Sequence, residues 1–357
     1  MAYESSATRE LLLESLKGMT LAIPDLKAMI AHWPASVNLH KNLLRDEVHE
    51  RFERLFPPGK RLQKMKLADA ALFGSSWWPY ASFEDLCVVT HLSTWLFAWD
   101  DELDSAEYSN LINDMDQATT FREYTIRYIR ACLNQDYGEP IALDSPIITD
   151  ITRVCEAVRQ GYPPEKTQIF LNELVYFVES CQLEQQNQVE GHLPTAQEYL
   201  QRRMGSGAVR VCLALSEFAC RIVLPSEIMA DPDMTTIWDA TNIVICIMND
   251  ILSFKKELAQ GQVDSILPVL FAEHGSMDTA MSIAASLIVQ SIRSVDDAAE
   301  RLLQRHGEDL ILRRDLGDFI DSCKYACTGN LNWSLVSGRF QICQTTTTDG
   351  ILVTLAS

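Results

Sequence analysis

Apolar residues recur every three to four positions along almost the whole chain, and strict alternation of apolar and polar residues is almost absent. The first spacing is typical of helices that bury one face or their whole surface. Glycine and proline clusters such as Pro57-Pro58-Gly59 and Gly191 to Pro194 interrupt the pattern. The pattern predicts helices over residues 7–17, 38–55, 61–73, 82–104, 106–134, 146–160, 164–187, 196–222, 235–260, 264–273, 277–305 and 308–327.

These helices predict an all-α fold, a single-domain bundle in which a pocket can lie between the helices. No internal repeat and no long linker divides the chain. We expect an N-terminal segment, residues 1–40, that packs on the bundle, a main domain over residues 41–340, and a flexible tail over residues 341–357.

Composition narrows the classes of function. The chain has 357 residues, of which 47% are hydrophobic, and its 49 acidic and 30 basic residues give a net charge of −19. This charge repels phosphate backbones and anionic lipids, which argues against a nucleic-acid partner. The sequence has no signal-like N-terminus and no apolar run long enough for stable membrane insertion, and its ten cysteines form no CxxC pair. We therefore expect a cytoplasmic protein with reduced thiols.

The segment FAWDDELD places acids where an apolar helix ends. Asp100 and Asp104 are one turn apart, offset by about 40° around the helix, and Phe97 lies one turn earlier on the same side. Acids are unfavourable at a helix C-terminus because the helix dipole is negative there. A bound cation would remove this conflict, whereas the alternative is an acidic helix end in water.

A second apolar helix carries a row of oxygen donors. Asn249, Ser253 and Glu257 follow the spacing i, i+4, i+8, and Lys256 lies beside them. Amide, hydroxyl and carboxylate oxygens together suit a hard divalent cation such as Mg²⁺. Each segment alone indicates a functional site, and the presence of both in one all-α chain strengthens that interpretation.

Three other motifs favour a structural interpretation. The string DDAAE at 296–300 resembles a second acidic motif but reads as a solvated helix face, and Asp231-Pro-Asp233 reads as a turn. Cys323 and Cys327 could face one another on a helix, but no second Cys/His pair accompanies them. His91, on the apolar helix, is expected to be a hydrogen-bonded residue of the core or pocket edge.

The strings DDELD at 100–104 and NDILSFKKE at 249–257 resemble the aspartate-rich and NSE motifs of class I terpene synthases, especially fungal and bacterial sesquiterpene cyclases. The aromatic lead-in WWPYASFEDLCVVTHLSTWLFAWDD is similar as well, and the resemblance extends roughly over residues 77–340. It implies a class I terpenoid synthase bundle with a central active-site cavity. It also implies a magnesium-dependent lyase that ionises a prenyl diphosphate, with farnesyl diphosphate favoured, and cyclises the carbocation to a sesquiterpene hydrocarbon or alcohol.

The resemblance also implies roles for individual residues. Three Mg²⁺ ions are expected, held by Asp100, less certainly by Asp104, and by the trio Asn249, Ser253 and Glu257. The diphosphate-sensing arginine falls on Arg203, 46 residues before Asn249, with Arg202 as a competitor. The linker and effector of the family then fall on Ser206 and Gly207.

The family usually ends with an Arg-Tyr pair that donates to the diphosphate, whereas this chain has Arg339-Phe340. Arg339 keeps the charge, Lys256 adds another, and Phe340 lacks the hydroxyl. Aromatic faces stabilise a carbocation by about 1–2 kcal/mol each in a dry pocket. Phe97 is the best candidate for such a face, followed by Trp77, Trp78, Tyr80 and Trp333.

Two alternatives stay open. An elongating prenyl transferase shares the fold and ions but joins two substrates, and it carries DDxxD-type motifs on both helices together with a basic pocket. A non-catalytic helical scaffold could keep the fold without the reaction. The sequence favours cyclisation, and it leaves monomer and homodimer both open.

Overall fold

The computed structural model describes residues 2–104, 107–134, 145–340, 345–347 and 350–355. These residues form mostly α-helices, together with one 3-10 helix and three short strands. The helices are α1 (Ala2–Leu16), α2 (Leu26–Met29), α3 (Lys41–Leu55), α4 (Lys60–Leu67), α5 (Ala70–Trp77), α6 (Phe83–Asp104), η1 (Leu111–Asn113), α7 (Met115–Leu133), α8 (Pro146–Thr149), α9 (Thr152–Gly161), α10 (Pro164–Val189), α11 (Ala196–Ser206), α12 (Val209–Leu213), α13 (Ser216–Cys220), α14 (Ser226–Met229), α15 (Pro232–Ala259), α16 (Ile266–His274), α17 (Met277–Arg305) and α18 (Leu310–Val336). The strands are β1 (Thr20–Pro24), β2 (Thr345–Thr347) and β3 (Gly350–Thr354).

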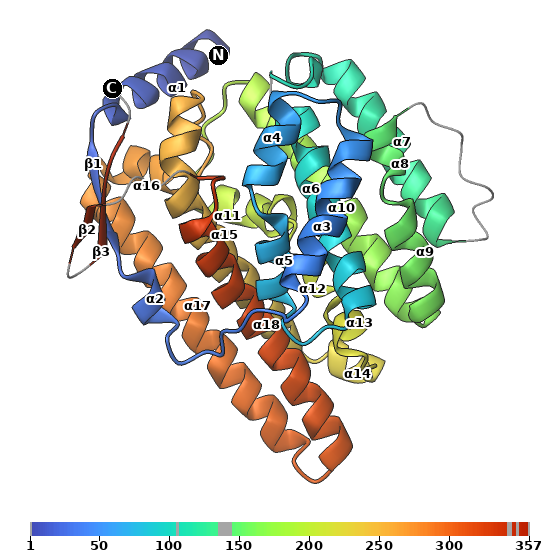
Figure 1. Cartoon of the computed structure of the whole chain (residues 1–357). Coiled ribbons are helices and arrows are strands. Elements are labelled where there is room, and N and C mark those ends of the chain that lie inside the picture. The colour runs from blue at the N-terminus through green and yellow to red at the C-terminus, as the bar shows by residue number, and fades with distance from the viewer. Residues whose placement is uncertain (1, 105–106, 135–144, 341–344, 348–349, 356–357) are drawn as a thin grey trace.

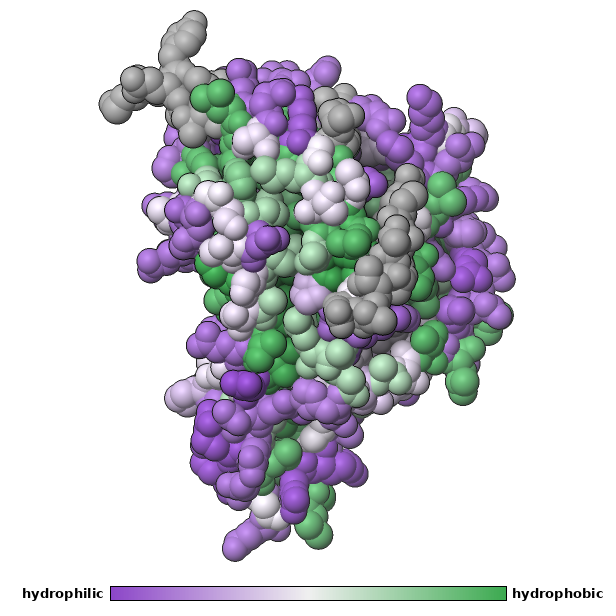
Figure 2. Space-filling view, turned by 90° about the vertical axis from the view of Figure 1, so that its left-hand side faces the viewer, coloured by the Kyte–Doolittle hydropathy of each residue, from purple (hydrophilic) through white to green (hydrophobic). Residues whose placement is uncertain are grey.

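The long helices form a bundle, and α17 and α18 extend from it as an antiparallel hairpin (Figure 1). Helix α15 packs against both members of this hairpin, α18 packs on α5, and α10 packs on α7 and α11. Figure 2 shows the face at the left of Figure 1, where hydrophobic residues gather across the middle and the projecting hairpin is hydrophilic. The arrangement confirms the predicted all-α fold.

Helix α15 is buried on almost every side because its sequence is apolar around its whole circumference. Its start is fixed by Asp231, whose carboxylate accepts from the N–H of Asp233, and by Pro232 in the first turn. Among the described residues it is the one helix long and apolar enough to cross a membrane, but 83% of that apolar window is buried inside the protein. This burial is typical of a core helix.

The sequence predicted one helix over residues 196–222, and the structure divides it into α11, α12 and α13. The first break follows Gly207, where Ala208 adopts a left-handed backbone conformation with φ 56°. Helix α13 ends at Cys220, and the residue that caps it, Arg221, is also left-handed. Similarly, the helix predicted over 61–73 divides at Asp69, which caps α5 through the N–H of Leu72.

The chain after residue 340 differs from the prediction of a loose tail. Strand β3 pairs antiparallel with both β1 and β2, in the order β1-β3-β2, so that Leu21 lies opposite Val353. Both of these side chains are buried. The prediction is therefore wrong for β2 and β3, because Val353 and Leu355 contribute to the core once β1 provides a partner strand. Residues 341–344, 348–349 and 356–357 lie outside the described residues, as do residues 135–144 of the helix break that Gly138 and Pro140 predict over 135–145.

The motifs interpreted as structural have structural partners. Asp296 on α17 forms an ion pair with Lys324 and hydrogen bonds to Trp33 and His32, while Asp297 and Glu300 are exposed. Cys323 and Cys327 are buried free thiols. Asp231 and Asp233 pair with arginines of α17 and form a helix start rather than a free turn.

Candidate active site

Helix α6 presents one face of the aspartate-rich segment to a cavity of about 590 Å³. Phe97, Asp100 and Asp104 line this cavity, as their spacing predicted. Glu102 lies on another side of the helix, where it forms a 2.5 Å ion pair with Arg61 of α4. Only part of the acidic segment is therefore available to a ligand in the cavity.

Helix α15 contributes the second row of oxygen donors to the same cavity. Asn249, Ser253 and Glu257 all line it, and the Ser253 hydroxyl donates to Glu257 at 2.6 Å. Asp104 and Ser253 thus lie at one cavity rather than on opposite surfaces. The aspartate-rich segment of α6 and the NSE segment of α15 therefore line the same cavity, as the resemblance implies.

The cavity places carboxyl groups in an unfavourable environment. Burial, followed by the charges of Glu184 and Asp101, raises the pKa of Asp100 to about 7. Burial and the Asp100 charge raise the pKa of Asp104 well above its ordinary value. On α15, burial and the Asp250 charge raise the pKa of Glu257 to about 7. Clustered buried acids of this kind call for a cation.

Among the described residues, five basic side chains line the cavity beside these acids, and three of them are the predicted Arg203, Lys256 and Arg339; the other two are Lys64 and Lys255. Arg203 donates to Asn249 at 3.3 Å and to Asp250 at 3.0 Å. Arg339 lies over the ring of Phe97, with its guanidinium carbon 4.6 Å from the ring centroid. Burial and then the Arg339 charge lower the pKa of Lys256. The cavity can therefore receive an anion despite the acidic net charge of the protein.

Arg202 occupies a different environment from Arg203. It does not line the cavity, but pairs with the buried Asp264 at 3.4 Å and lies over the ring of Tyr199. The geometry thus favours Arg203 over Arg202 as the arginine that meets a ligand.

Gly207 is required by a close approach rather than by an unusual backbone angle. It caps α11 with φ −68°, and a Cβ at this position would lie 2.4 Å from the Cys246 sulfur. Gly207 and Ser206 both line the cavity where the helix is interrupted. The interruption brings main-chain groups into contact with the cavity.

An aromatic wall covers one side of the cavity. We use this name for the five lining residues Phe73, Trp77, Phe97, Trp333 and Phe340. The rings of Phe97 and Trp333 stack with centroids 5.8 Å apart, and Phe340 contacts Trp333 edge-on. Of the other aromatic candidates, Trp78 is buried outside the lining and Tyr80 is partly exposed.

Two of the acids at the cavity that sequence reasoning missed are Glu184 and Asp250. Glu184 of α10 lines the cavity and raises the pKa of both Asp100 and Asp104 through its charge. Asp250 is 1% exposed at its side chain and accepts from Tyr199 and Arg203. Asp250 directly follows Asn249 in the motif, which was a usable signal, whereas the spacing around Glu184 carries none.

The donor set fits a divalent metal that is shared with a ligand. Among the described residues, no three His, Cys, Asp or Glu side chains are close enough to form a metal site alone. The oxygens of Asp100, Asp104, Asn249, Ser253 and Glu257 are hard donors of the kind Mg²⁺ uses when phosphate oxygens and water complete its coordination. A cation would also neutralise the buried carboxylates.

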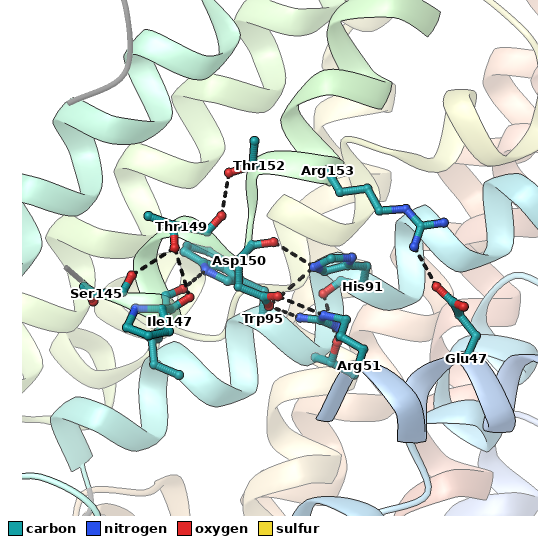
Figure 3. Close-up of polar contacts among 12 residues, drawn as sticks. Glu47, Arg51, His91, Trp95, Ser145, Ile147, Thr149, Asp150, Thr152 and Arg153 are labelled. Carbon is teal, nitrogen blue, oxygen red and sulfur yellow. Dashed lines mark hydrogen bonds and ion pairs between the residues drawn. The ribbon is translucent and has the colours of Figure 1, made fainter. Parts of the chain in front are cut away.

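A buried ion pair anchors α6 from α3 and from the turn between α8 and α9 (Figure 3). Arg51 donates to Asp150 and to Thr94, and His91 lies 2.8 Å from the main-chain oxygen of Asp150. Burial lowers the pKa of His91, which keeps it neutral, so His91 is a hydrogen-bonded core residue as predicted. Burial alone would raise the pKa of Asp150, but hydrogen bonds from His91 and Arg51 lower it to about 2.

We expect Asp150→Asn to lower the free energy of unfolding by about 3 kcal/mol at pH 7, because it leaves Arg51 buried without a charged partner. Because the pKa of Asp150 is lower in the folded than in the unfolded protein, its carboxylate stabilises the fold above pH 3.8. This stabilisation is lost as the pH falls towards 2. The difference from the parent should therefore be constant from pH 5 to 8 and shrink below about pH 4. Denaturant unfolding at pH 7, 5 and 3.5 measures it.

Arg153→Ala is the control for that measurement. Arg153 forms a partly exposed pair with Glu47 beside the cluster (Figure 3) and should cost less than about 1 kcal/mol. An equal loss in both variants would contradict the anchoring role of Asp150.

Comparison with known proteins agrees with this geometry. The model of terpene synthase family 2, C-terminal metal binding, matches residues 91–294. Sesquiterpene cyclase hepA of Aspergillus oryzae is 33% identical over 331 residues, which cover 89% of this chain and 88% of that protein. The chain belongs to the terpene synthase family. It is a fungal-type class I synthase, an enzyme of the lyase kind, and its family supports the use of a divalent metal.

Further relatives and structures extend this assignment. Terpene cyclase braA of Annulohypoxylon truncatum is 23% identical, covering 93% of the synthase and 89% of the relative. The crystal structure of α-eudesmol synthase superposes with a TM-score of 0.76 at 21% identity, over 86% of the synthase and 98% of that chain. A linalool/nerolidol synthase from Streptomyces clavuligerus, in complex with 2-fluorogeranyl diphosphate, gives 0.73 at 19% identity, over 86% and 98%. These structures establish the class I terpenoid synthase fold.

Proposed function

We propose that the synthase is a magnesium-dependent sesquiterpene cyclase that ionises farnesyl diphosphate, cyclises the carbocation and releases diphosphate. One observation carries the proposal: two helices with oxygen donors and the basic side chains of Arg203, Lys256 and Arg339 line one cavity that also has an aromatic wall. The first group suits a diphosphate with its cations, and the second suits a hydrocarbon chain. The similarity to sesquiterpene cyclase hepA supports the fifteen-carbon substrate.

The polar residues of the cavity have two roles in this proposal, metal binding and diphosphate binding. Asp100, Asp104, Asn249, Ser253 and Glu257 would hold Mg²⁺, with three ions expected. When bound, the metal withdraws charge from the diphosphate and makes it a better leaving group. Arg203, Lys256 and Arg339 donate to the diphosphate oxygens, and Asp250 orients Arg203 through the 3.0 Å contact.

The aromatic wall would then protect the carbocation. Departure of diphosphate leaves an allylic cation, which water or any buried nucleophile would quench. The faces of Phe97 and Trp333 stabilise positive charge by about 1–2 kcal/mol each. Phe340 occupies the position of the family's tyrosine and packs edge-on against Trp333, so it extends the wall instead of donating to diphosphate.

The test of cyclisation is incubation with Mg²⁺ and farnesyl diphosphate as the sole substrate. We expect a volatile sesquiterpene hydrocarbon or alcohol, detected by gas chromatography, and one equivalent of diphosphate. Formation of product only after addition of isopentenyl diphosphate would instead identify an elongating transferase.

The scaffold alternative is tested by ligand-dependent stability. A synthase should gain thermal stability when Mg²⁺ and diphosphate are both present, and much less with either alone, because each completes the binding site of the other. A chain that shows no joint effect and no turnover would be a scaffold. Oligomeric state, monomer or homodimer, and cytoplasmic location are separate expectations.

A further inference from the structure

The break between α11 and α12 deprives one main-chain oxygen of its helical donor. In an uninterrupted helix the N–H of Ala208 would donate to the oxygen of Met204. Ala208 is instead left-handed, and its N–H donates to the oxygen of Gly205 at 3.1 Å. An oxygen at a helix end needs a donor from another part of the chain. The break therefore depends on what donates to Met204.

Asn242 of α15 supplies this donor. Its amide nitrogen donates to the main-chain oxygen of Met204 at 2.7 Å, and its amide oxygen accepts from the Cys246 thiol at 3.1 Å. The Asn242 side chain is 0% exposed, so water does not compete for either bond. Because Met204 directly follows Arg203, Asn242 fixes the main chain beside that arginine.

The same face of α15 also holds the side chain of Arg203. Asn242, Cys246, Asn249 and Asp250 lie within about 100° around the helix. Arg203 donates to Asn249 at 3.3 Å and to Asp250 at 3.0 Å, and its main-chain oxygen lies 3.9 Å from the Cys246 sulfur. Helix α15 thus holds Arg203 through its guanidinium and through the adjoining main chain.

The position of the guanidinium depends on both of these contacts. Arg203 lies in the last turn of α11, next to the break, and it lines the cavity, whereas Asn242 does not. A group that stabilises developing charge tolerates little displacement, because a misplacement of about 1 Å can cost about a hundredfold in rate. Asn242 can therefore affect the reaction without touching the substrate.

We infer that Asn242 is a positioning residue, which holds the main chain at the helix break so that the Arg203 guanidinium meets the substrate diphosphate. The inference rests on the proposed function. The contact matters most when the C–O bond of the substrate breaks, because the diphosphate keeps the bonding electrons and gains one negative charge. Inorganic diphosphate resembles this leaving group, so its affinity reports on the contact without turnover.

The experiment compares the parent with Asn242→Leu and Asn242→Ala. Leucine keeps the branched shape, alanine cannot clash, and melting temperatures show which variant folds. In saturating Mg²⁺ we expect the Kd of inorganic diphosphate, measured by calorimetry, to rise about tenfold in either variant. With farnesyl diphosphate, kcat should fall about tenfold or more while KM stays within about threefold.

A double-mutant cycle with Arg203→Lys distinguishes positioning from general stabilisation. If Asn242 acts through Arg203, adding Asn242→Leu to Arg203→Lys should raise the Kd of diphosphate by less than about twofold more. A further tenfold rise in the double variant would show that the two residues act independently, and it would overturn the inference.

Thr241→Val is the matched control. Thr241 precedes Asn242 on α15 and is also 0% exposed, but it lies about 100° away around the helix, where its main-chain oxygen contacts the Cys327 thiol of α18. Diphosphate affinity should stay unchanged in this variant. An unchanged affinity in both Asn242 variants, or an equal loss in Thr241→Val, overturns the inference while the cyclase function stands. A parent that binds diphosphate with Mg²⁺ but forms no terpene instead refutes the proposed function.

Discussion

Asp100→Asn and Asn249→Ala each lower the turnover of farnesyl diphosphate by about a thousandfold or more, while circular dichroism shows unchanged helicity. Asp100→Asn removes the negative charge that α6 would offer the metal, and Asn249→Ala removes a donor oxygen of α15. The loss of one such preorganised contact costs about 10²–10³ in rate. Steady-state release of diphosphate measures the loss. Full activity in both variants would remove these residues from the reaction.

Stability separates this loss from misfolding. Because burial raises the pKa of Asp100 to about 7, its carboxyl is ordinarily protonated in the metal-free fold below that pH. A raised folded pKa destabilises the fold progressively as pH rises above the unfolded value of 3.8, with the full cost present above about pH 7. Asp100→Asn should therefore melt at an equal or higher temperature than the parent at pH 8 in a chelator.

Glu102→Gln is the control for the aspartate-rich helix. Glu102 shares the acidic segment but pairs with Arg61 outside the cavity lining. Its turnover should stay within a few fold of the parent. A thousandfold loss here would indicate that the segment acts through its net charge rather than through the face that carries Asp100 and Asp104.

The parts of the site that lie within single helices were predictable from sequence. The positions of Asp100 relative to Asp104, and of Asn249 relative to Ser253 and Glu257, depend only on 3.6 residues per turn. The apolar residues around them indicated burial, and burial is what raises the pKa of these acids. That the two helices face one cavity came from the resemblance, because periodicity does not fix which helices meet.

The parts that depend on tertiary contact were not predictable in the same way. Glu184 lies in a polar stretch of α10 where no spacing distinguishes it from Glu179 or Gln186. Strands β1 and β3 pair across most of the chain length, and neither is long enough to be stable alone. The break at Ala208 directly follows Gly207, which approaches Cys246 closely, and the helical pattern of residues 196–222 revealed neither feature.

Arg203→Lys lowers turnover by about a hundredfold or more, whereas Arg202→Lys keeps it within about fivefold. Arg203 contacts both Asn249 and Asp250. Lysine has a point charge in place of a planar guanidinium group, so at position 203 it could not keep these contacts and also donate to a diphosphate. Arg202 does not line the cavity and is held by its ion pair with the lining residue Asp264, so its replacement should reduce thermal stability more than the chemical step. Single-turnover rates at saturating substrate, combined with melting temperatures, separate the two effects. If Arg202→Lys lost the chemical step and Arg203→Lys kept it, the sensing role would belong to Arg202, and the contact between Arg203 and Asp250 would be structural only.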